Sequence, residues 1–176
     1  MQRRAKCFKS LTFVLFALFF LWILIQFLAP LALPKGSVED LSGLVAVSDN
    51  ENTIKGMNWP WNFVYSAGDR LCHQKAERSI FINDNQMPFC TRCTAIWLGI
   101  AIGLGFMVFY KIQLNEKFLF AIIIGIIPIG IDGIGQLFGF WESTNIIRFV
   151  TGLLVGIVCG VAFGIIIDEI KEIRKK

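Results

Sequence analysis

The chain has 176 residues, of which 55% are hydrophobic and 17% are charged, with a formal net charge of +4. Soluble domains carry about 25% charged residues, so this composition excludes an ordinary water-soluble monomer. The positive charges lie beside apolar runs, as membrane topology requires, and therefore do not indicate a nucleic-acid-binding protein.

Four apolar stretches are long enough to cross the hydrocarbon core of a bilayer, which takes roughly 20 helical residues. They are continuously apolar rather than alternating, which argues against a transmembrane β-barrel. The sequence therefore predicts an all-α integral membrane protein with four transmembrane helices, at Leu11–Ala29, Thr94–Tyr110, Phe118–Phe138 and Ile146–Ile167.

The Lys and Arg residues predict the orientation, because short cytoplasmic segments are enriched in positive charge. Ten lie in the N-terminal segment, the 111–117 turn and the C-terminal tail, whereas the other side has seven over a longer stretch. We therefore expect both termini in the cytoplasm of a cell-membrane protein. The predicted parts are an anchor (1–33), an extracytoplasmic loop (34–93) and a three-helix core with a cytoplasmic tail (94–176).

The first apolar stretch also has the basic and apolar regions of a signal peptide. Its length and the lack of an A-x-A cleavage site favour an uncleaved anchor. In the last stretch, small residues recur every four positions, which lets helix backbones approach closely and favours packing within the chain over a dimer contact. These residues are Gly152, Gly156, Gly160 and Gly164.

The outer loop divides into a polar part and a structured part. Residues 34–58 are polar and predict a loosely ordered connection. Asn62–Gln74 has apolar residues near helical spacing and predicts a short helix on the membrane surface. Ser79–Ile82 and Met87–Cys90 predict a small hairpin that leads into the second membrane helix.

The first group of residues that could carry chemistry is Cys72, His73, Cys90 and Cys93, which includes the only histidine of the chain. Three thiolates and an imidazole form a complete tetrahedral zinc set, and C-x₂-C lets two sulfurs share a metal. The weakness is that adjacent Cys72 and His73 would both have to turn inward. A disulfide is the competing interpretation, because an extracytoplasmic compartment is often oxidising.

The second group lies within the membrane. Asp132 and Gln136 are one turn apart on the same face of the third helix. Charged groups in lipid normally pair or serve a site, and Arg148 in the first turn of the fourth helix is the expected partner of Asp132. Glu142 and Asn145 occupy the same outer turn, behind a predicted N-cap at residue 143 or 144.

If the predicted topology holds, both groups lie at the outer ends of their helices and form one pocket. In contrast, Cys159 is expected to be a packing residue and Cys7 a thiol next to the membrane without a partner.

These motifs resemble a family of small prokaryotic predicted membrane proteins grouped under a domain of unknown function. The resemblance covers about 63–156. It rests on Cys72-His73-Gln74, Glu77-Arg78-Ser79, Cys90-x-Arg92-Cys93-Thr94, Asp132-Gly133-x-x-Gln136, Asn145, Arg148 and Thr151-Gly152. It implies a multi-pass membrane protein in which both groups act as one unit, and it implies no activity.

Three interpretations stay open at this point. The first is a Cys/His metal site, with zinc as the metal and an anionic lipid or a small molecule as a further ligand. The second is a membrane thiol-disulfide oxidoreductase that uses Cys90 and Cys93, with Cys72 as the resolving thiol and a quinone as electron acceptor. The third is a non-enzymatic lipid-binding or transport subunit that uses Asp132 and Arg148.

Overall fold

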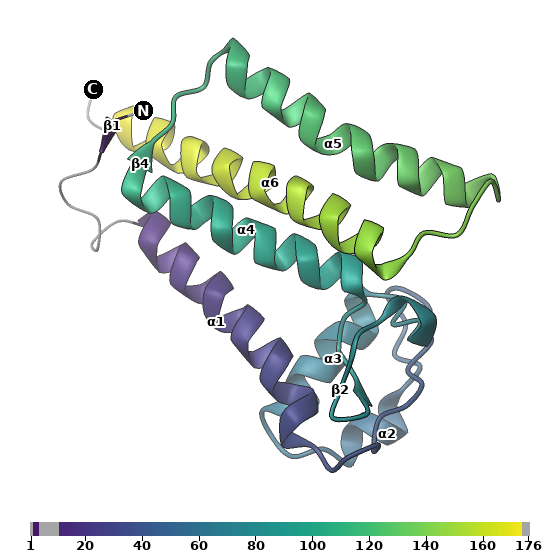
Figure 1. Cartoon of the computed structure of the whole chain (residues 1–176). Helices are drawn as coiled ribbons and strands as arrows, with labels where there is room; N and C mark the ends of the chain where they lie inside the picture. The colour runs from purple at the N-terminus through teal and green to yellow at the C-terminus, as the bar shows by residue number, and fades with distance from the viewer. Residues whose placement is uncertain (1, 4–10, 174–176) are drawn as a thin grey trace. The chain divides into compact units, whose positions relative to one another are not determined.

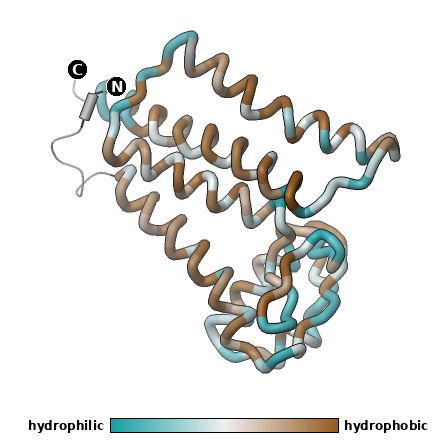
Figure 2. The backbone as a smooth tube through the Cα atoms, in the orientation of Figure 1, coloured by the Kyte–Doolittle hydropathy of each residue, from teal (hydrophilic) through white to brown (hydrophobic). Residues whose placement is uncertain are grey.

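A computed structural model describes residues 2–3 and 11–173 of the chain. Within these residues, four helices are long and apolar enough to cross a membrane. They are α1 (Leu11–Ala32), α4 (Thr91–Phe109), α5 (Glu116–Leu137) and α6 (Asn145–Ile173), and Figure 2 shows them as mainly hydrophobic stretches. The predicted all-α fold with four transmembrane helices is thus confirmed, whereas the side on which the termini lie stays a prediction.

The described residues form two compact units. Unit 1 contains the chain up to Leu21 and from Ala95 onward, and unit 2 is Trp22–Thr94. The shorter elements are α2 (Glu51–Lys55), α3 (Trp61–Leu71), the 3₁₀ turn η1 (Ala76–Arg78), and the antiparallel pairs β1 (Gln2–Arg3) with β4 (Tyr110–Lys111) and β2 (Phe81–Ile82) with β3 (Asn85–Gln86).

In unit 1, α4 and α6 run side by side in the same direction (Figure 1). A Cβ atom on Gly156 would overlap the carbonyl oxygen of Ile96 and lie 2.8 Å from the Cα of Gly99. One turn further along both helices, a Cβ on Gly103 would lie 3.0 Å from the Cα of Gly160. The glycine stripe therefore packs backbone against backbone within one chain, as the sequence predicts.

Local hydrogen bonds fix both ends of α5 and the start of α6. The side chain of Asn115 caps α5 by accepting from the backbone N–H of Phe118 at 3.0 Å. The other end of α5 is a Schellman turn, with Gly139 in the left-handed region at φ +72 and Phe140 N donating to Gly135 O at 2.9 Å. Thr144 caps α6, since its hydroxyl accepts from the N–H of Ile147.

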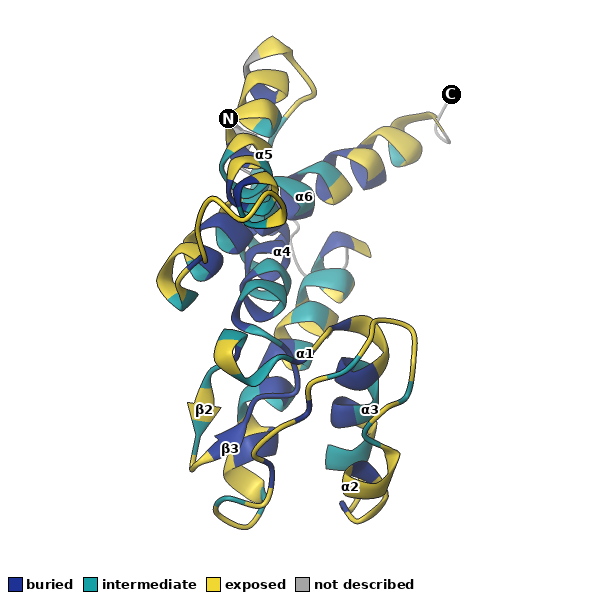
Figure 3. Ribbon diagram, turned by 90° about the vertical axis from the view of Figure 1, so that its right-hand side faces the viewer, coloured by how far each residue is buried: buried dark blue, intermediate teal, exposed yellow. Residues whose placement is uncertain are grey.

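Unit 2 has its own hydrophobic core, made by the last turns of α1, by α3 and by the segment between them. The buried members of this core are Ala29, Val38, Leu41, Ile54, Met57, Val64 and Tyr65, and Figure 3 shows the buried face of α3. Residues 34–58 are therefore not the loose connection that their polarity predicts. They contain α2 and contribute four buried side chains, because apolar residues spaced singly in a polar segment can still reach a core.

Several predicted boundaries move. Helix α3 ends at Leu71, three residues before its predicted end at Gln74, and α6 continues to Ile173, six residues beyond its predicted end. Helix α1 continues through Pro30 to Ala32, and the Asn85 side chain donates to the carbonyl oxygen of Pro30 at 2.9 Å. The hairpin turn contains only Asn83 and Asp84, both at positive φ as a type I′ turn requires, so its second strand is Asn85–Gln86 rather than Met87–Cys90. Helix α4 begins at Thr91, three residues earlier than predicted.

Candidate functional site

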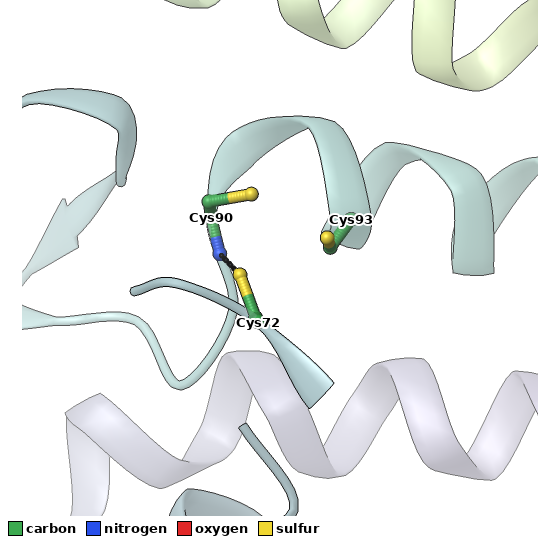
Figure 4. Close-up of side chains that lie close together, drawn as sticks. All are labelled: Cys72, Cys90 and Cys93. Carbon is green, nitrogen blue, oxygen red and sulfur yellow. Dashed lines mark hydrogen bonds between the residues drawn. The ribbon is translucent and has the colours of Figure 1, made fainter. Parts of the chain in front are cut away.

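The structure brings together three cysteines of unit 2. The sulfur atoms of Cys72, Cys90 and Cys93 all lie within 4.8 Å of one another, and Figure 4 shows them facing a common space. Cys72 is 3% exposed, while the other two are half-buried. All three are free thiols in this structure, so the group can offer three sulfur ligands to a single metal ion.

Cys90 owes its position to the start of α4. It is the residue before the first helical residue, Thr91, so its side chain lies where the first helical N–H groups lack backbone partners. Hydrogen bonds from the side chains of Cys72 and Cys93, and then from the backbone N–H groups of Cys93 and Arg92, lower the pKa of the Cys90 thiol. The sequence predicts Cys93 just before this helix, but in the structure Cys93 lies in the first turn of α4.

Cys72 ends α3 and has extended backbone, with φ −144 and ψ 148. Its sulfur accepts the N–H of Cys90 at 3.4 Å and that of Gln74 at 3.5 Å. The side-chain hydrogen bond to Cys90 is the first cause that raises the pKa of the Cys72 thiol. The Cys72 sulfur thus accepts hydrogen bonds both from its own segment, at Gln74, and from the segment that precedes α4, at Cys90.

The structure does not place His73 with the cysteines. Neighbouring side chains of an extended backbone point to opposite sides, so Cys72 is buried and His73 is exposed. His73 is not among the residues whose ligand atoms lie close together. Of the four predicted metal ligands, three meet and the imidazole lies outside.

The chain segments that carry the cysteines are joined by two buried glutamines. The side chain of Gln74 donates to the carbonyl oxygen of Pro88 at 2.8 Å. The side chain of Gln86 donates to the carbonyl oxygen of Gln74 and accepts the N–H of Leu41 at 3.1 Å. Its backbone carbonyl accepts the hydroxyl of Tyr65 at 2.7 Å, and burial raises the pKa of that hydroxyl.

Sequence reasoning missed the role of these glutamines. Gln74 belongs to a motif that carries the family resemblance, but the motif does not show what its amide holds. Gln86 was expected in a turn, where a polar residue needs no explanation. Both are 1% exposed or less, and only the folded structure shows this burial.

Gly68 lets α3 approach the segment before Cys90. A Cβ at this position would overlap the carbonyl oxygen of Pro88 and lie 2.6 Å from the side-chain nitrogen of Gln74. Any other residue would therefore push α3 away from the Cys90 segment. The cysteine group depends on this close approach, because Cys72 follows α3 directly.

The second predicted group gathers at one end of α5 and α6 in unit 1. The side-chain nitrogen of Gln136 donates to the Asp132 carboxylate at 3.1 Å, and its oxygen accepts from Arg148 at 3.2 Å. Arg148 also donates to Asn145 at 3.3 Å. Gln136 thus links the acid and the base that the sequence predicts as partners, and Asn145 belongs to the same network.

A tryptophan that the sequence did not indicate also takes part. The indole N–H of Trp141 donates to Asp132 at 3.3 Å, and a Cβ on Gly135 would overlap the indole ring. The Schellman turn at the end of α5 returns the chain so that this ring lies on Gly135. Glu142 is next to it in sequence and is exposed.

The remaining predictions concern the shared pocket and the two other cysteines of the chain. The two groups lie in different units, so the expectation that they form one pocket stays a prediction. Cys7 lies outside the described residues. Cys159 is in α6 and is half-buried, apart from the three clustered cysteines.

Comparison with known proteins identifies a family, and the descriptions of the matched proteins state no activity. The family described as "Predicted membrane protein (DUF2085)" matches residues 72–162. The chain is 36% identical to "Uncharacterized protein MJ1492" of Methanocaldococcus jannaschii over 104 residues, which is 54% of this chain and 65% of that relative. It is also 36% identical to an uncharacterized protein of Methanothermobacter thermautotrophicus over 87 residues, 49% of this chain and 78% of that relative. No solved structure matches the chain.

Proposed function

This chain belongs to the DUF2085 family of predicted membrane proteins, and we propose that it binds one zinc ion through Cys72, Cys90 and Cys93. The observation that carries the proposal is the distance between the sulfurs, all within 4.8 Å of one another. Zinc holds sulfur at about 2.3 Å, which separates two tetrahedral thiolates by about 3.8 Å. The three side chains therefore need to move by only about 1 Å to share an ion.

The hydrogen bonds around the sulfurs support a ligand role. Metal-bound thiolates are oriented by neighbouring donors, and Cys72 receives two backbone N–H groups. Cys90 receives backbone N–H groups at the start of α4, which favour the thiolate form that binds metal. Thiolate ligands suit zinc better than they suit the hard cations Mg²⁺ and Ca²⁺.

The fourth zinc ligand in this proposal is not a residue of the cluster. Because His73 is exposed, three protein ligands leave one position for water or for a small-molecule ligand, as in catalytic zinc sites. A water bound there would lose a proton more readily than free water does. The positive-inside pattern of the sequence supports an extracytoplasmic location for the site.

Elemental analysis of the purified full-length chain tests the metal site. We expect about one zinc per chain, a loss of most of it in Cys90→Ser, and no loss in the matched variant Cys159→Ser, whose sulfur lies outside the cluster. Cobalt substitution should give sulfur-to-metal charge-transfer absorption in the wild type and in Cys159→Ser, and most of this absorption should be lost in Cys90→Ser. Protein that carries no zinc after purification in zinc-containing buffer, with all three thiols free, would overturn the proposal.

Thiol-disulfide exchange is the second candidate, and the position of Cys90 before α4 favours it. Reactive C-x-x-C pairs have the same placement at a helix start. Oxidation of the Cys90 and Cys93 thiols would form one S–S bond and release two electrons and two protons. A membrane quinone would accept them and become a quinol. Free-thiol counting separates the two candidates, because a bridged Cys90–Cys93 pair without metal supports exchange.

A further inference from the structure

We propose that the exposed face of α3 binds a membrane phospholipid, with an acyl chain in an apolar groove and the phosphate at Arg70. The groove has a volume of about 330 Å³ and is lined by Phe63, Ser66, Ala67, Arg70 and Leu71. This inference concerns unit 2 alone and does not depend on the zinc proposal.

The groove follows one stripe of α3. Phe63, Ala67 and Leu71 are spaced by four residues, so their side chains follow one another along the helix. Phe63 is 61% exposed and Leu71 58% exposed, although the other side of α3 is buried in the core of unit 2. A helix with an exposed apolar stripe of this kind is typical of the membrane interface.

A second, polar pocket adjoins the groove. It has a volume of about 180 Å³, and Ser66 and Arg70 line both spaces. Its walls also include Glu51, Lys55 and Asp69. An apolar groove that meets a polar pocket fits an amphiphile, because a plain hydrocarbon would leave the polar pocket unused and a soluble metabolite would leave the groove unused.

The acidic residues of the polar pocket already have partners. Glu51 forms an ion pair with Lys55 at 2.5 Å. The Asp69 carboxylate is buried and accepts from the side chain of Asn50 at 2.7 Å. Together with Arg70, two acidic and two basic residues line the pocket. Their formal charges cancel, so the pocket as a whole attracts neither anions nor cations.

Arg70 is the group that can bind a phosphate. Its side chain is exposed, and its Nε donates to the hydroxyl of Ser48 at 3.4 Å. Within the part of the chain that the structure describes, Arg70 forms no ion pair. The terminal nitrogens of its guanidinium can therefore donate to two oxygens of a phosphate, and the Ser66 hydroxyl offers a further donor on the wall that both spaces share.

The apolar end of the groove adjoins a membrane helix. The ring of Phe63 packs edge-on against Trp22 of α1, with ring centroids 6.2 Å apart. Leu24 and Leu28 of the same helix are exposed, as expected where lipid surrounds it. Arg70 lies seven residues after Phe63, about 10 Å along α3. A phospholipid whose chain lies beside α1 can therefore reach Arg70 with its phosphate.

Native mass spectrometry of the full-length chain in detergent tests this proposal, because it identifies each bound lipid by its mass. The probes are phosphatidylethanolamine, diacylglycerol, which has the chains without the phosphate, and glycerophosphoethanolamine, which has the phosphate without the chains. We expect the first phosphatidylethanolamine to bind about fivefold more tightly than diacylglycerol, the gain that an exposed charge pair supports. Glycerophosphoethanolamine should not bind at the same concentrations.

Substitutions assign the binding to this groove. Arg70→Gln should remove the fivefold preference, whereas Lys35→Gln removes another exposed cation of unit 2 and should retain it. Ala67→Phe fills the groove and should weaken binding of both lipids, while Ile124→Phe adds the same ring to an exposed part of α5 and should not.

Three results would overturn the proposal. The first is an unchanged preference in Arg70→Gln, and the second is equal binding of phosphatidylethanolamine and diacylglycerol by the wild type. The third is binding of phosphatidylglycerol far more tightly than phosphatidylethanolamine in both the wild type and Arg70→Gln, which would assign lipid binding to the general positive charge of the chain.

Discussion

The two units hold their chain segments together by different means. In unit 1, long helices satisfy their own backbone groups, and glycines let α4 and α6 approach until their backbones touch. In unit 2, the regular elements are short, and buried side-chain amides bind backbone groups far away in sequence. The Asn85 side chain, for example, accepts the N–H of Val38 at 3.0 Å and donates to the carbonyl of Pro34 at 2.9 Å.

The difference shows how each unit can carry a site. Unit 1 packs α4 against α6 through backbone contacts, and its polar network lies where α5 ends and α6 begins. Amide cross-links in unit 2 hold irregular segments in fixed positions, which is what three cysteines from two segments require. Replacing a glycine with alanine tests the close backbone contacts, and replacing a buried glutamine with leucine tests the amide cross-links.

The largest effect is expected for Gly68→Ala in unit 2. The added methyl group would overlap the Pro88 carbonyl, so α3 must move and the free energy of unfolding should fall by about 3 kcal/mol or more. Zinc binding should be lost with it. Thermal unfolding in detergent measures the change, and Gly56→Ala is the control, since its nearest atom would be 3.6 Å away. Equal stability of both variants would contradict the close approach.

Gly156→Ala tests the same principle in unit 1. The methyl group would press on the Ile96 carbonyl and the Cα of Gly99, and overpacking of this kind costs about 2 kcal/mol. Gly130→Ala is the matched control, because a Cβ there meets nothing within 4 Å. We expect a lower melting temperature for the first variant and an unchanged or higher one for the second. The reverse order would show that α4 and α6 do not pack through glycine.

Gln86→Leu removes the amide that joins several segments of unit 2. The buried N–H of Leu41 would lose its acceptor, and an unsatisfied buried donor costs about 2 kcal/mol. Stability and zinc content should both fall, whereas Gln113→Leu, at an exposed position, should change neither. Retention of zinc in a destabilised Gln86→Leu protein would show that this amide supports the fold without orienting the cysteines.

The smallest effect is expected at the start of α6. Thr144→Ala removes the hydroxyl that accepts from Ile147, and loss of an N-cap costs about 1 kcal/mol. Thr144→Ser keeps the hydroxyl and should retain most of the stability. The melting temperatures of the two variants give the comparison, and an equal loss in both would assign the effect to the methyl group instead of the cap.

The sequence alone determined the four membrane helices and the intramolecular glycine contact. Length and apolar content are local properties of a segment, and the bilayer acts on each segment in the same way. The same reasoning failed for residues 34–58, since burial of single residues such as Val38 and Leu41 depends on partners distant in sequence.

Only the tertiary structure decided which ligands meet. The extended backbone that follows α3 turns Cys72 inward and His73 outward. The approach of Gly68 to Pro88 then determines whether Cys72 reaches Cys90 and Cys93. Such contacts join segments that the chain order leaves apart, so their geometry follows from packing and not from residue spacing.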